Sequence, residues 1–200
     1  MNLEKYQQYS RIARGLEKAD LVLKDARIVN VFTEEIIRGD IAIQDGIIAG
    51  IGSFHGKEER DLAGRYVCPG FIDSHLHLES TLVTPAELVT AASRHGTTTF
   101  IVDPHESANV SGLAGIDYIL DQTEDVKANV YVMMPSCVPA TAIDDNGCTL
   151  TAEDMAPYLH NSRILGLGEV MDSISVVQGE KSMHDKLELF EGRIRDGHAP

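Results

Sequence analysis

The architecture of this chain follows from one segment, Pro69-Gly70-Phe71-Ile72-Asp73-Ser74-His75-Leu76-His77-Leu78-Glu79. It predicts a short buried strand, Tyr66 to Ile72, that runs out into a His-x-His pair. On an extended chain, residues i and i+2 point to the same side, so His75 and His77 can present two imidazoles to one point in space. That geometry suits a divalent metal, although two histidines that merely hydrogen-bond at a strand end would give the same short motif.

Composition indicates an ordinary globular protein. With 200 residues, 43% hydrophobic and 24% charged, the chain has room for one or two domains. Its 17 basic and 31 acidic side chains give a net charge of −14, which repels phosphate backbones and acidic lipids and so disfavours nucleic-acid and membrane partners. Cys68, Cys137 and Cys148 form no Cys-x-x-Cys motif and predict reduced thiols in a cytoplasmic protein. No apolar run approaches membrane-spanning length.

Residues 1–65 predict a helix followed by a small β domain with a structural role. Apolar residues at helical spacing predict an amphipathic helix from Glu4 to Leu16. Short β-branched runs then predict four closely spaced strands, at 20–24, 26–32, 35–44 and 46–51. Because no helix separates them, we expect a small antiparallel sheet, with a polar boundary stretch at 52–64.

After Ile72 the pattern alternates between helix and strand. The expected helices are 85–95, with Thr84 and Glu87 as a capping box, 113–122, 151–160, with Thr151 and Asp154 at its start, and 186–191. The expected strands are 97–102, 129–134, 164–168 and 193–197. Near-continuously apolar strands separated by helices predict a parallel sheet that helices cover.

Polar residues follow the carboxyl ends of the successive strands: His75 and His77, His105 and Glu106, Ser136 and Cys137, Glu169, and His198. In a βα barrel those ends share the face that holds the active site. An open doubly wound sheet would also gather them. However, Gly166-Leu167-Gly168 is followed by Met171 where a dinucleotide fingerprint needs its third glycine.

The motif that ends in the His-x-His pair resembles the first barrel strand of the amidohydrolase superfamily of metal-dependent hydrolases, and its continuation to Pro85 resembles the bacterial adenine deaminases. The resemblance continues in Asp103-Pro104-His105-Glu106, in Met133-Met134-Pro135-Ser136-Cys137-Val138-Pro139, in Gly166-Leu167-Gly168-Glu169-Val170-Met171 and in Asp196-Gly197-His198-Ala199-Pro200.

This resemblance implies an α/β fold, in which half of a β-sandwich at 1–65 precedes a partial TIM-type (β/α) barrel at 66–200. Five strand ends can be counted and a closed barrel needs eight, so we expect a truncated barrel, the N-terminal portion of a longer enzyme. An open arc of strands would expose apolar edges unless another chain covers them, and we expect a homo-oligomer.

The same resemblance implies a binuclear divalent-metal site. In it, His75 and His77 bind the first metal, Glu169 bridges the two metals as the catalytic carboxylate, and His198 binds the second. Manganese or iron is favoured by the resemblance, and zinc also suits the ligands. Glu79, His105 and Glu106 are the candidate substrate-binding residues, with structural hydrogen bonding or orientation of a ligand histidine as the alternative.

The activity that the resemblance implies is hydrolysis of a C–N bond of a cyclic amidine, the deamination of adenine to hypoxanthine and ammonia. A purine base would then be the small-molecule partner. Two alternatives stay open. One is another amidohydrolase reaction, such as ring opening of a cyclic amide or sugar deacetylation; the other is an inactive N-terminal fragment.

Overall fold

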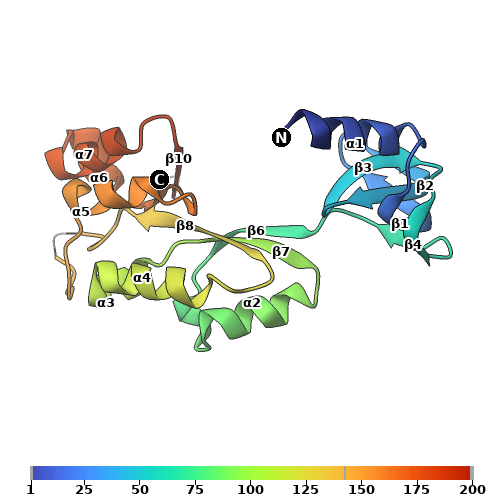
Figure 1. Cartoon of the computed structure of the whole chain (residues 1–200). Coiled ribbons are helices and arrows are strands. Elements are labelled where there is room, and N and C mark those ends of the chain that lie inside the picture. The colour runs from blue at the N-terminus through green and yellow to red at the C-terminus, as the bar shows by residue number, and fades with distance from the viewer. Residues whose placement is uncertain (1, 142, 199–200) are drawn as a thin grey trace. The chain divides into compact units, whose positions relative to one another are not determined.

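The computed structural model describes residues 2–141 and 143–198. Ala199 and Pro200, which end the last of the motifs above, lie outside the described residues. Contacts divide the chain into two compact units, Met1–Pro69 and Gly70–Pro200 (Figure 1). Within the described ranges, no helix is both long enough and apolar enough to cross a membrane.

The first unit is a mixed five-stranded sheet with one helix. Its elements are α1 (Leu3–Ala13), β1 (Ala19–Asn30), β2 (Glu35–Gln44), β3 (Ile47–Gly52), β4 (Gly56–Asp61) and β5 (Tyr66–Val67). The strand order is β3-β2-β1-β4, and β5 also pairs with β1. β2 runs antiparallel to β1 and β3, whereas β4 and β5 run parallel to β1. Ile12, Val22 and Phe54 belong to one of its two buried clusters, and Ala26 and Ile41 to the other.

Three predictions for this unit are wrong. The runs 20–24 and 26–32 form the single strand β1, whose pairing with β2 continues across an irregularity between Leu23 and Ala26. The polar stretch 52–64 contains β4, and its parallel pairing with β1 makes the sheet mixed. Every side chain of β4 after Gly56 is exposed, so the alternating apolar signal of a strand is missing there.

A buried carboxylate holds the irregularity in β1. Asp25 adopts the left-handed region with φ 49°, and its N–H donates to Asp40 Oδ1 at 3.1 Å. Asp40, only 8% exposed, also accepts from Phe54 N–H at 3.1 Å and from Lys24 Nζ. Burial alone would raise the pKa of Asp40, but these hydrogen bonds outweigh it and hold the pKa below its ordinary value.

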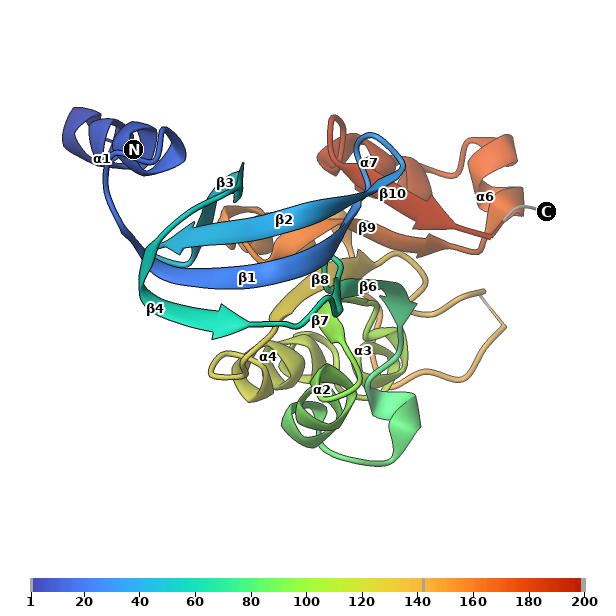
Figure 2. The ribbon, with the colours of Figure 1, turned by 90° about the vertical axis from the view of Figure 1, so that its right-hand side faces the viewer.

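The second unit is a curled parallel half-barrel (Figures 1 and 2). Its elements are β6 (Phe71–Leu76), η1 (Glu79–Thr81), α2 (Pro85–Ser93), β7 (Thr97–Val102), α3 (His105–Ser111), α4 (Leu113–Gln122), β8 (Asn129–Pro135), α5 (Ala152–Met155), η2 (Ala156–His160), β9 (Ile164–Val170), α6 (Ser173–Gln178), α7 (Lys181–Leu189) and β10 (Ile194–Gly197). The five strands β6 to β10 are parallel and adjacent in chain order, which confirms the predicted α/β fold with a partial barrel.

The core of this unit lies between the strands and helices α2, α3 and α4, which run along one face of β6, β7 and β8 (Figure 2). Phe100 and Val132 from the strands and Ile116 and Ile119 from α4 are almost wholly buried. Full burial of such a side chain stabilises the fold by about 1.5–3 kcal/mol. The strands are therefore fixed from outside, and their carboxyl ends are free to carry polar groups.

The predicted buried strand from Tyr66 to Ile72 is wrong. Tyr66 and Val67 form β5 and pair with β1, and β6 begins only at Phe71. The interruption falls at Pro69-Gly70, where proline has no N–H to donate to a strand ladder. Phe71 is 61% exposed because β6 is an edge strand whose one neighbour among the described residues is β7.

The helix starts are partly as predicted. α2 begins at Pro85, but the Thr84 side chain makes no capping hydrogen bond, so the expected capping box is absent. At α5 the capping box between Thr151 and Asp154 is confirmed, although the α-helix continues beyond Met155 as the 3-10 helix η2. The short helices α3 and α6 were not predicted, because neither has the length that makes a 3.6-residue period visible.

We predict that Asp40→Ala lowers the free energy of unfolding by about 2 kcal/mol at pH 7, because it leaves two backbone donors and the Lys24 amine without their acceptor. The pKa of Asp40 is depressed from 3.8 in the folded state, so its contribution is full above that pH and is lost as the pH falls through the folded-state pKa. Urea unfolding from pH 3 to 7 measures this.

Glu58→Ala, which breaks the exposed ion pair with Arg60, is the matched control in the same unit and should change stability by less than about 1 kcal/mol. An Asp40→Ala effect that is equal at pH 3 and pH 7 would contradict the proposed role of the carboxylate charge.

Candidate metal centre

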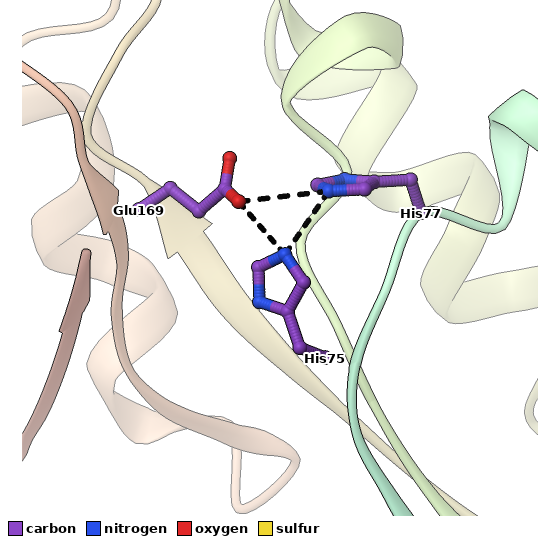
Figure 3. Close-up of side chains that lie close together, drawn as sticks. All are labelled: His75, His77 and Glu169. Atoms are coloured by element: carbon purple, nitrogen blue, oxygen red, sulfur yellow. Dashed lines mark hydrogen bonds and ion pairs between the residues drawn. The ribbon is translucent and has the colours of Figure 1, made fainter. Parts of the chain in front are cut away.

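Imidazole and carboxylate groups meet at the carboxyl end of the half-barrel. β6 carries His75 near its end, His77 follows the strand, and β9 carries Glu169. His75 Nε2 lies 3.1 Å from His77 Nε2 and 2.7 Å from Glu169 Oε1 (Figure 3). His77 Nε2 lies 3.7 Å from the same oxygen. The ligand atoms of these three residues all lie within 4.8 Å of one another, so the group could hold a metal ion.

The second nitrogen of each imidazole is already committed to a partner. His77 Nδ1 lies 2.8 Å from the carbonyl oxygen of Asp103, which can only accept, so Nδ1 carries the proton and Nε2 presents a lone pair. His75 Nδ1 lies 3.1 Å from Asp196 Oδ2, a carboxylate that favours the same arrangement. Both Nε2 lone pairs and the Glu169 carboxylate therefore point toward one region.

Three acceptors that face one another repel unless a cation lies between them. Two ligand atoms that are each about 2.1 Å from an ion lie about 3.0–3.4 Å apart, and the two Nε2 atoms are 3.1 Å apart. Imidazole and carboxylate are donors that divalent first-row metals accept. The residues present therefore fit a divalent ion.

Buried negative charge around these side chains also indicates that the site suits a cation. Glu169 is 5% exposed and Asp103 is 1% exposed, and within the described ranges no Lys or Arg forms an ion pair with either. Both Asp103 side-chain oxygens lack a hydrogen-bond partner among the described residues. Burial, with the charge of Glu169 second, raises the pKa of Asp103 to about 8. A bound cation would relieve this excess of buried carboxylates.

His198 also lies at this site, with its Nε2 3.2 Å from Glu169 Oε1. A bridging carboxylate would offer one oxygen to the His-x-His pair and the other to His198, but here His75 and His198 approach the same oxygen. The second oxygen, Oε2, faces His105 Nε2 at 3.7 Å instead. His105 thus reaches Glu169 although it follows β7, which is not a neighbour of β9 in the sheet.

The remaining candidate residues form a group beside the ligands. Glu106 Oε2 lies 3.3 Å from His105 Nε2 and 3.5 Å from His77 Nδ1, and Ser80 Oγ donates to Glu106 Oε1 at 2.8 Å. Glu79 Oε1 accepts from Ser107 N–H at 3.3 Å. Burial, together with the adjacent Glu106 carboxylate, raises the pKa of Glu79 to about 7. His77, His105 and Glu106 form the other group near enough to hold an ion.

Sequence reasoning gave no role to three residues that the structure brings to the site. Asp103 and Asp196 face the ligand histidines through a main-chain carbonyl and a carboxylate, and Ser136 Oγ donates to the main-chain oxygen of Glu169 at 2.7 Å. Each follows or ends a barrel strand, as the recognised candidates do. Position at a strand end was thus the available signal, and residue type alone did not separate ligands from their supports.

A cavity of about 500 Å³ adjoins the ligands, and its lining includes His75, Glu169, Asp196 and His198. Small-molecule sites occupy about 300–1,000 Å³. The apolar side of the lining comes from Ile101 and other strand residues. Its volume and its mixed polar and apolar lining suit a small molecule.

Comparison with known proteins gives the following matches. A model of the amidohydrolase family matches residues 66–191. The chain is 58% identical to an adenine deaminase of Desulfitobacterium hafniense over 100% of this chain and 35% of that protein. It is 49% identical to adenine deaminase 2 of Carboxydothermus hydrogenoformans over 94% of this chain and 33% of that protein. The chain thus spans about a third of the length of these curated relatives.

A solved structure, the zinc and phosphonate complex of N-acyl-D-glutamate deacylase from Bordetella bronchiseptica, superposes with a TM-score of 0.54 at 21% identity. It covers 77% of this chain and 39% of that chain. At this identity the likeness supports the fold.

The position of Asp103 depends on a glycine in β9. A Cβ at Gly168 would lie 2.1 Å from Asp103 Oδ2 and 3.0 Å from Met133 Cβ. We predict that Gly168→Ala lowers the free energy of unfolding by about 1–3 kcal/mol through this collision. Chemical denaturation measures the change, and Gly52→Ala, whose Cβ would meet only the Phe54 ring at 3.4 Å, is the control. Asp103→Ala in the Gly168→Ala background should recover part of the loss; strict additivity would contradict the contact.

Proposed function

This chain belongs to the amidohydrolase family, and from that membership we propose that the protein deaminates adenine to hypoxanthine and ammonia. The observation that carries the proposal is the convergence of His75, His77 and Glu169 at the strand ends of a parallel half-barrel. It occurs in a chain that matches adenine deaminases over 94–100% of its length. Because those relatives are about three times longer, the activity is proposed for the protein that carries this chain.

We propose that His75, His77, Glu169 and His198 hold a binuclear divalent-metal centre. A divalent ion held there would lower the pKa of water toward about 7 and so would supply a hydroxide nucleophile at neutral pH. Manganese or iron is the metal that we favour, and zinc also suits the ligand set.

The chain's own residues would prepare this site in two ways. The Asp103 carbonyl and the Asp196 carboxylate hold the imidazoles of His77 and His75 so that each Nε2 faces the centre. Glu169, buried among them, would supply the negative charge that offsets two cations, which is the role we propose for it as the catalytic carboxylate.

We propose that Glu79, His105 and Glu106 bind the purine base beside the metals. Glu106 lies 3.3 Å from His105 Nε2, and Ser80 fixes its other oxygen. Carboxylate and imidazole groups offer acceptors and donors that match the ring nitrogens and the exocyclic amine of adenine. These side chains adjoin the ligand histidines, so a base held by them would present C6 to the centre.

The remaining proposals concern the setting of the enzyme. We propose a cytoplasmic, homo-oligomeric enzyme of purine metabolism that binds neither nucleic acid nor membrane, as its net charge of −14 favours. We also propose that residues 1–65 and 66–200 are its small β domain and the first part of its barrel.

The expected substrate is tested directly. The full-length protein, loaded with Mn²⁺, should release ammonia from adenine, and it should open neither dihydroorotate nor hydantoin. Coupled ammonia detection and hypoxanthine absorbance provide two independent readouts. Hydrolysis of a cyclic amide without ammonia release from adenine would replace the deaminase assignment with another amidohydrolase reaction. If the 200-residue chain is inactive while the full-length protein is active, this chain by itself is an inactive fragment of an active enzyme.

The metal assignment is tested by His75→Asn combined with His77→Asn. Removal of two ligands should reduce bound metal at least about tenfold, because Glu169 and His198 would be left to hold it without the paired imidazoles. Metal content by plasma mass spectrometry after desalting provides the measurement. His184→Asn, which changes an exposed histidine on α7 that bonds the Val176 carbonyl, is the control. Unchanged metal content in the double variant would refute the site.

A further inference from the structure

The main chain of Glu169 is held by a side chain at the point where its strand loses a partner. The parallel ladder between β8 and β9 ends at the pair Pro135 and Gly168, and Pro135 has no N–H to extend it. The next residue, Ser136, is 1% exposed and donates from Oγ to the Glu169 carbonyl oxygen at 2.7 Å. This hydroxyl therefore continues the contact between the two strands up to Glu169.

Ser136 is held in turn by a lysine from outside the sheet. Lys186 lies on α7, is 7% exposed, and donates from Nζ to the Ser136 carbonyl oxygen at 2.7 Å. One turn earlier on α7, Met183 is buried to the same degree, so an apolar side chain fits this layer. A buried amine with one acceptor among the described residues costs more free energy than such an apolar side chain.

We propose that Lys186 is a positioning residue for Glu169, acting through Ser136. The bond from Lys186 fixes the Ser136 main chain, and the Ser136 hydroxyl fixes the Glu169 main chain. That arrangement keeps the Glu169 carboxylate 2.7 Å from His75 Nε2. The inference rests on the proposed role of Glu169 as a metal ligand. Groups that orient a ligand from outside the coordination sphere typically change metal affinity by about 10–100-fold.

The test measures Mn²⁺ affinity in the full-length protein by competition with a chelating dye. Lys186→Met, Ser136→Ala and the double variant are compared with Ser136→Thr, which keeps the hydroxyl. Lys181→Met is the matched control, because Lys181 lies on the same helix, is exposed and pairs only with Asp185 among the described residues. Circular dichroism and thermal unfolding without metal report whether each variant folds.

We expect Lys186→Met and Ser136→Ala each to raise the Kd for Mn²⁺ about tenfold. The double variant should raise the Kd little further, because the Lys186 bond acts on Glu169 only through Ser136. Ser136→Thr and Lys181→Met should stay near the wild-type Kd. A wild-type Kd in both single variants would overturn the inference while leaving the metal site intact. Absence of Mn²⁺ binding by the wild type would instead overturn the proposed function, and the inference with it.

If Lys186→Met does not fold, the comparison of Ser136→Ala with Ser136→Thr tests the proposal. A Kd that is about tenfold higher in Ser136→Ala and near the wild-type value in Ser136→Thr supports the proposed positioning of Glu169. A wild-type Kd in both variants overturns it.

Discussion

The site depends on one electrostatic constraint: two imidazole nitrogens and a carboxylate oxygen, all suited to bind a cation, point toward the same region. The Nε2 atoms of His75 and His77 and Oε1 of Glu169 lie within 2.7–3.7 Å of one another. Like partial charges at such distances repel. The surrounding structure must therefore hold these groups in place, and a divalent cation is the species that makes the arrangement favourable.

Parallel strands provide that support. Adjacent strands of a parallel sheet end at the same edge, so residues distant in sequence reach one region without a long loop. Glu169 lies between β8 and β10, and its main chain is fixed on the β8 side by the Ser136 hydroxyl. The apolar layer formed by α4 and its neighbours fixes the strands from the other side. Binding groups and supporting groups thus come from different layers of one half-barrel.

The sequence predicted this arrangement where its signal was periodic. β7, β8 and β9 follow from apolar runs and the cap of α5 from capping chemistry, and a polar residue after each of these strands marked the site. The failures have a different origin. β4 exposes its side chains, so only its backbone pairing makes it a strand. The support from Asp103, Asp196 and Lys186 depends on tertiary contacts between residues far apart in the chain, and no local pattern encodes such contacts.

The sheet supports the Glu169 carboxylate and the imidazoles of His75 and His77 differently. Glu169 has a strand on each side, whereas β6, which leads into the His-x-His pair, has one neighbour, β7, among the described residues. The two kinds of candidate ligand are therefore positioned by different means. Main-chain contacts on both sides fix the strand that carries Glu169, whereas the imidazoles of His75 and His77 are oriented through their Nδ1 atoms, by the Asp196 carboxylate and the Asp103 carbonyl.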